Sequence, residues 1–129
     1  PPSQVMVSLA MILTFFIMQP VGEIAYKNGV KPYIEKKIGY EEAFERGVLP
    51  FKEFMIRNTR EKDLALFFRI RKMKNPQTYK DVPLSIATPA FLISELKSAF
   101  EIGFLLYLPF LVIDMVVSSV LMSMGMMML

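Results

Sequence analysis

Hydrophobic and polar positions divide the 129-residue chain into an apolar part, a charged part and a second apolar part. All fifteen Lys and Arg residues, and eleven of the twelve Asp and Glu residues, lie between Val21 and Ile102. No stretch shows the apolar and polar alternation of a strand. The pattern predicts an all-α protein: a first apolar helix within residues 1–21, a small charged helical domain over 22–88, and a long apolar helix over 89–129.

The second apolar part is the longest such stretch, because Ile102–Leu129 carries only one charge, Asp114. At about 1.5 Å per residue its 28 residues would measure roughly 42 Å as a helix, more than the ~30 Å of bilayer hydrocarbon. Gly125 can adopt the left-handed conformation that ends helices. We therefore expect a helix to about Met124, kinked at Pro109, and a methionine-bearing loop beyond Gly125.

A stripe of small and polar residues follows one face of this predicted helix, at about 100° per residue. Together with Pro109, the candidate packing and assembly residues are Gly103, Tyr107, Asp114, Ser118 and Gly125. Such a stripe should face protein or water. A mid-helix carboxylate costs several kcal/mol in hydrocarbon unless it is paired or faces water, so Asp114 is a functional or assembly candidate. The alternative is a protonated or serine-bonded aspartate that only locks helix packing.

The first apolar helix is predicted over Val5–Val21, about 25 Å long, which is near the short limit for a membrane span. A broken helix with a turn at Gly29 and Pro32 should follow it. A short helix is then expected over Tyr40–Arg46. It should close at Gly47, and Pro50 suits the first turn of the next helix.

The rest of the charged part predicts one further helix and a loop. Asn58–Glu61 has the form of a capping box, which would open a helix from Thr59 to about Lys74. Its expected inner face is Leu64, Phe67, Phe68 and Ile70, and its expected outer face is Lys62, Arg69 and Lys72. This basic stripe is either a solvated face or a binding site for anionic lipid. After a loop, Thr88 would cap the last helix, with Pro89 at its first position.

Composition favours a membrane-associated chain, with 53% hydrophobic residues and a mean hydropathy of +0.40. The absence of cysteine and histidine removes the commonest metal ligands and the commonest general base, so neither a hydrolase, a zinc site nor a cofactor is indicated. The net charge of +3 is modest, and the basic residues are interleaved with acidic ones, which disfavours a nucleic-acid-binding groove. The Pro-Pro start and the apolar end predict a fragment.

Several segments resemble the FliP family of flagellar export-gate proteins and its type III secretion relatives. They are Leu13–Val21, Phe51–Leu64, Pro89–Phe104, Pro109–Asp114 and Gly125–Met128. The resemblance covers nearly the whole chain and is weakest over Met73–Asp81. It also implies that an amino-terminal apolar segment, and a further apolar hairpin after the methionines, are missing.

The resemblance implies a channel-forming subunit of the flagellar type III export apparatus in the bacterial inner membrane, at the flagellar basal body. Several copies would assemble into a ring with FliQ-like and FliR-like subunits around a conduit for unfolded polypeptide. The charged part would be periplasmic, and the methionine loop would constrict the closed channel. Carried over, the gate residues are Met126, Met127 and Met128, with Met124 beside them.

Methionine suits such a gate, because a thioether chain is apolar, flexible and unbranched and can both exclude ions and deform around cargo. The same methionines could instead contact lipid or pack at a helix end, and a Cu(I) thioether site is a third hypothesis. Two other classes of protein stay open: a membrane-anchored module that docks a partner through the basic stripe, and an intramembrane aspartyl protease. The second would need two carboxylates at depth, and only Asp114 is present.

Overall fold

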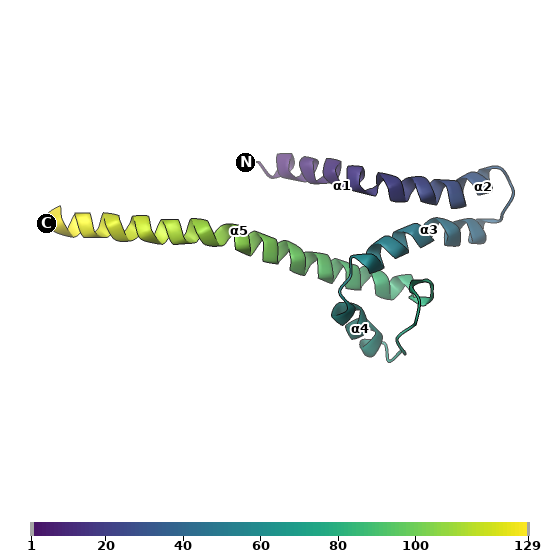
Figure 1. The fold of residues 1–129 in the computed structure, drawn as a ribbon. Helices are drawn as coiled ribbons and strands as arrows, with labels where there is room; N and C mark the ends of the chain where they lie inside the picture. Colours follow the sequence, from purple (N-terminus) through teal and green to yellow (C-terminus); the bar gives the residue numbers. More distant parts are fainter. Residues whose placement is uncertain (1, 129) are drawn as a thin grey trace. The chain divides into compact units, whose positions relative to one another are not determined.

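The computed structural model describes residues 2–128 and consists of helices joined by short connections (Figure 1). In chain order these are α1 (Ser3–Ala25), the π-helical η1 (Tyr26–Val30), α2 (Lys31–Ile34), α3 (Tyr40–Arg57), α4 (Glu61–Ile70), the 3-10 helix η2 (Tyr79–Asp81) and α5 (Leu84–Met128). No strand occurs within the described residues, so the all-helical prediction is confirmed. The chain forms two compact units, residues 1–91 and 92–129, and each is described by itself.

The first unit is organised by a helical hairpin. α1, η1 and α2 follow one another without a break, and α3 returns alongside them (Figure 1). A Cβ atom on Gly29 would lie 2.6 Å from the carbonyl oxygen of Ala43 and 2.8 Å from the backbone nitrogen of Gly47. These distances are too short for a side chain, so glycine lets the two backbones meet. The prediction that a helix ends at Gly47 is wrong, because α3 continues through this residue. Gly47 instead contacts Gly29 at the crossing of the two helices.

Gly29→Ala should lower the free energy of unfolding by about 1–3 kcal/mol, because the added methyl group overpacks a contact made of backbone. Gly22→Ala, in the preceding helix α1, is the matched control: nothing lies within 4 Å of its Cβ position, so it should stabilise by about 0.5–1 kcal/mol. Thermal unfolding of the full-length protein in detergent measures both. Equal melting temperatures for the two variants would show that the crossing is not close.

The turn of the hairpin lies between α2 and α3. Lys36 has a left-handed backbone, with φ at 61°, and the rings of Tyr33 and Tyr40 meet edge to face with their centroids 6.2 Å apart. The Lys37 ammonium nitrogen lies 3.0 Å from Oε2 of Glu35. Its hydrogen bond and its charge hold the pKa of the Glu35 carboxyl below the ordinary value.

A small hydrophobic core joins α4 to the first turns of α5. Its buried members are Phe68, Val82, Ile86 and Ala87, and Met55, Ile56, Leu64 and Phe67 pack against them. The inner face predicted for this helix is therefore confirmed at Leu64, Phe67 and Phe68. It is wrong at Ile70, which is 63% exposed. Ile70 is the last residue of α4, where the chain turns away from the core.

The predicted capping box at Asn58–Glu61 is wrong, because Asn58 ends α3 instead of opening α4. The Asn58 side-chain amide donates to the carbonyl of Phe54 (2.9 Å), and the Thr59 hydroxyl donates to the carbonyl of Met55 (2.5 Å). Short polar side chains make such local bonds to the backbone at either end of a helix. α4 instead begins after Arg60, and it ends at Ile70, before the predicted Lys74.

Two prolines predicted at helix starts lie inside helices. α3 runs through Pro50 without ending at Arg46 or Gly47. α5 begins at Leu84, so Thr88 and Pro89 lie within it, and the Thr88 hydroxyl points to the sulfur of Met55 at 3.9 Å. The early start of α5 follows from packing, because it buries Ile86, Ala87 and Ala90. Burial outweighs the backbone hydrogen bond that proline cannot make.

Candidate functional site in the long apolar helix

The part of α5 in the second unit is exposed along its apolar length. Every described side chain from Pro109 to Met127 is exposed, and the large apolar ones range from 36% at Leu111 to 88% at Met127. Exposed apolar surface costs about 25 cal/mol per Å² against water. A helix of this kind is stable only where lipid or other protein chains cover it.

Among the described residues, two helical stretches are long and apolar enough to cross a membrane, Ser3–Ile34 and Leu84–Met127. None of the most apolar window in either stretch is buried within the chain. Helices of a water-soluble core would hide such windows, whereas these offer them to the surroundings. The two predicted apolar helices are therefore present, and both are longer than predicted.

The predicted loop after Gly125 is not observed, because α5 continues through Gly125 to Met128. No described glycine has a positive φ, so Gly125 does not take the conformation that ends helices. Methionine is a good helix former, which lets the run continue. Met124, Met126 and Met127 are 55%, 75% and 88% exposed and project from the helix. The side chain of Met128 lies outside the described part.

The small and polar stripe keeps its helical spacing, because α5 is continuous through Pro109 from Gly103 to Gly125. Tyr107, Asp114 and Ser118 lie on it and are exposed. Nothing comes within 4 Å of a Cβ position at Gly103 or Gly125, so both leave open backbone. Open backbone on an apolar helix is where a second helix packs closely.

Asp114 has no hydrogen-bond or ion-pair partner among the described residues. Ser119, five residues further along α5, differs, since its hydroxyl donates to the carbonyl of Met115 at 2.9 Å and is therefore satisfied within the helix. The carboxylate thus has no partner within the described part of its own unit, residues 92–128. It needs one from water or from another chain wherever the surrounding helix is covered by lipid.

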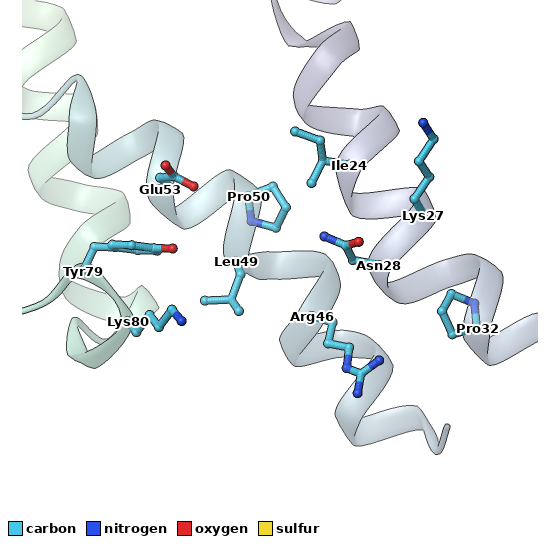
Figure 2. Close-up of a pocket in the computed structure, with 10 residues that line it drawn as sticks. All are labelled: Ile24, Lys27, Asn28, Pro32, Arg46, Leu49, Pro50, Glu53, Tyr79 and Lys80. Atoms are coloured by element: carbon cyan, nitrogen blue, oxygen red, sulfur yellow. The ribbon is translucent and has the colours of Figure 1, made fainter. Parts of the chain in front are cut away.

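A separate hollow of about 440 Å³ lies in the first unit, between η1 and α3 (Figure 2). Lys27, Arg46 and Lys80 bring positive charge to it. Arg46 bonds to Glu42 at 2.5 Å, and Glu53, also in the wall, bonds to Arg57 at 2.9 Å. The charges of Arg46 and Glu53 are paired along α3, and Lys27 and Lys80 alone do not make a convergent set of groups for catalysis. No group of three potential metal-ligating side chains occurs in the described part either.

Comparison with known proteins decides the family. The model of the FliP family matches residues 1–129. The chain belongs to the FliP family. It is 55% identical to a relative from Bacillus subtilis (strain 168) and 54% identical to one from Caulobacter vibrioides, over the whole chain in both cases. A relative from Aquifex aeolicus is 44% identical over 131 residues, and all three are named flagellar biosynthetic protein FliP.

This FliP-family chain is shorter than its relatives. It spans 58% of the Bacillus protein, 48% of the Caulobacter protein and 55% of the Aquifex protein. The resemblance found in the sequence is thereby confirmed at the level of the family. The close approach at Gly29 was missed, because glycine in a sequence signals a turn more often than a helix crossing.

Proposed function

We propose that this chain is part of a channel-forming subunit of the flagellar type III protein export apparatus. The full-length protein would pass unfolded flagellar proteins across the bacterial inner membrane. The observation that carries this proposal is the long exposed apolar helix α5, which combines a polar stripe with terminal methionines. Membership of the FliP family supports the flagellar role.

Self-association into a ring accounts for the two faces of α5. The stripe from Gly103 to Gly125 offers small residues for close helix contacts, and it carries a carboxylate that hydrocarbon would not accept. Neighbouring copies, with FliQ-like and FliR-like subunits, would cover this stripe. The apolar residues on the other faces would then pack on further subunits or on lipid.

The methionines would gate the conduit. Several copies of Met124, Met126, Met127 and Met128 meeting at one axis would form a narrow apolar ring that excludes water and ions. Their unbranched chains can also rearrange around an exported segment of any composition. The structure places the described three on a helix, so we propose that the ends of these helices, and not loops, converge on the axis.

The charged domain between the two apolar helices would lie in the periplasm, within the flagellar basal body. We propose a structural role for this subunit and no catalysis. A carboxylate pair of the kind used by intramembrane aspartyl proteases would need a second acid at depth, and the apolar part of α5 offers only Asp114.

Imaging the detergent-purified full-length complex tests the proposal. We expect subunits arranged in a ring, with residues 124–128 of each copy at the axis. A lone protomer, or methionines turned outward into the detergent belt, would contradict it. Crosslinking between cysteines placed at position 126 of neighbouring copies supplies an independent check, since only an axial position brings these residues together.

A further inference from the structure

Methionine is concentrated near the end of α5, and the proposed gate does not use all of it. Five of the eleven methionines of the chain lie within residues 122–128. Four of these five are the gate residues already named. The fifth, Met122, is exposed and has no role in the gate. Its presence on this helix therefore calls for a separate explanation.

Met122 belongs to a line of methionines along one side of α5. The thioether stripe consists of Met115, Met122 and Met126. At about 100° per residue, these three side chains fall within a sector of about 40°, roughly a quarter turn away from the stripe that contains Asp114. Because α5 is continuous from Leu84 to Met128, the structure realises this spacing. The stripe is thus a separate face of the helix.

The side chains of the thioether stripe are not covered within their own unit, and all three are more than half exposed. Two methionines of the first unit differ. Met55 packs against the small core, and Met18 lines a hollow together with Phe15 and Phe51. Filling space beside apolar and aromatic groups is the usual role of methionine. The thioether stripe lacks such neighbours and is open to a ligand.

Met122 and Met126 lie one helical turn apart, which suits them to hold one ion together. Side chains four residues apart on a helix are neighbours, with Cβ atoms about 5–6 Å apart. Methionine is long, unbranched and flexible, so two such side chains can bring their sulfur atoms to one point between them. Met115 lies about 10 Å further back along the helix axis, too far to share that ion.

Thioether sulfur determines the kind of ion that such a pair can hold. It is neutral and polarisable, so it binds soft ions such as Cu(I), whereas Ca²⁺ and Mg²⁺ prefer oxygen ligands. No group of three acidic side chains that could hold a metal ion occurs among the described residues. One positive charge also costs less than two beside an apolar helix. These arguments favour a soft monovalent cation.

We propose that Met122 and Met126 bind Cu(I) through their two sulfur atoms. Each sulfur donates one lone pair to the ion, no covalent bond of the protein breaks, and no electron is transferred. Each copy of the chain holds one ion on its own helix, so the site needs neither a ring of subunits nor a working gate. A thioether carries no proton at neutral pH, so binding releases none.

Silver(I) is the probe, because it is a soft monovalent cation that is stable in air. The full-length protein, with isotopically labelled methionine methyl groups, is purified in detergent and titrated with silver nitrate in a chloride-free buffer. We expect the methyl NMR signals of Met122 and Met126 to shift together and to saturate at one ion per protomer. Sodium nitrate should shift neither signal. The affinity should stay constant between about pH 5.5 and 8, because neither ligand titrates.

Leucine variants separate a two-sulfur site from binding by single sulfur atoms. Met122→Leu keeps the helix and the apolar volume but removes one of the two ligands. The affinity for silver should fall about tenfold or more, because the second sulfur no longer acts at the high effective concentration that the first one sets. Met126→Leu should have the same effect, and circular dichroism confirms the helical content of each variant.

The matched control combines Met11→Leu and Met18→Leu. These substitutions remove two thioethers from α1, where seven residues separate them, so they cannot share an ion. The control should keep the full affinity for silver and the joint shift of the Met122 and Met126 signals.

Three results would overturn the proposal. Silver that shifts neither methyl signal would mean that the pair binds no soft ion. Full affinity in both single leucine variants would mean that the two sulfur atoms do not share one ion. Binding that weakens as the pH falls would assign the ion to a carboxylate such as Asp114. A failed methionine gate would change none of these readouts, because they measure ion binding and not ion flux.

Discussion

Replacing Met126, Met127 and Met128 with alanine in the full-length protein should make the membrane leaky to small ions. Alanine removes the thioether chains that would fill the constriction, so water could enter and carry ions. If the methionine ring contributes only about 1.4 kcal/mol to the barrier for ion passage, its loss raises the leak about tenfold. Ion flux into proteoliposomes that contain the purified complex measures the effect.

The matched control replaces Met6, Met11 and Met18 of α1 with alanine. These three substitutions remove the same number of thioether side chains, but from the other apolar helix. We expect the assembled complex to stay closed in this control. An intact ring with wild-type ion flux after the triple change in α5 would show that the methionines do not seal the conduit.

Asp114→Leu should impair assembly of the complex in the membrane. The carboxylate lacks a partner among the described residues of its own chain, so we expect its partner to come from a neighbouring subunit or from water in the conduit. An interhelical polar contact is worth about 1–2 kcal/mol, so its loss should weaken subunit association roughly 5- to 30-fold per contact. Native gel electrophoresis of the solubilised complex, together with secretion of flagellar subunits, measures this.

Asp114→Asn separates charge from hydrogen bonding, because it keeps the polar group but not the ionised form. If Asp114 is a protonated residue that locks helix packing, Asn should restore assembly; if it is ionised, Asn should fail as Leu does. Ser119→Ala is the control on the same helix, because this hydroxyl bonds only to its own backbone at Met115. Normal assembly and secretion by Asp114→Leu would refute a role for this carboxylate.

The apolar and charged parts of the chain could be predicted from hydropathy, because the lengths of apolar runs reflect their surroundings directly. The errors fall on residues that usually end or begin helices. Gly47, Pro50 and Pro89 each lie inside a helix, since packing around them outweighs their local preferences. At Gly47 the reason is the approach of Gly29, which joins positions eighteen residues apart in the sequence.

The residues of the candidate site could be predicted from the sequence, but the backbone conformation at Gly125 could not. The stripe that contains Asp114 needs only helical periodicity, and α5 supplies it. A helix would end at Gly125 only if this glycine adopted a positive φ, and the spacing of apolar residues does not predict the φ of a glycine. The exposure of Ile70 could not be foreseen either, because it depends on where α4 turns from the core.

The contact between Gly29 and Gly47 has a consequence for how such a protein can diverge. The two helices of the hairpin meet there through main-chain atoms, so this contact requires no large side chain. Bulky residues nearby, such as Tyr40 and Phe44, remain 69% and 56% exposed. Natural selection could therefore exchange these outer groups to suit new neighbours while the individual subunit keeps its own architecture.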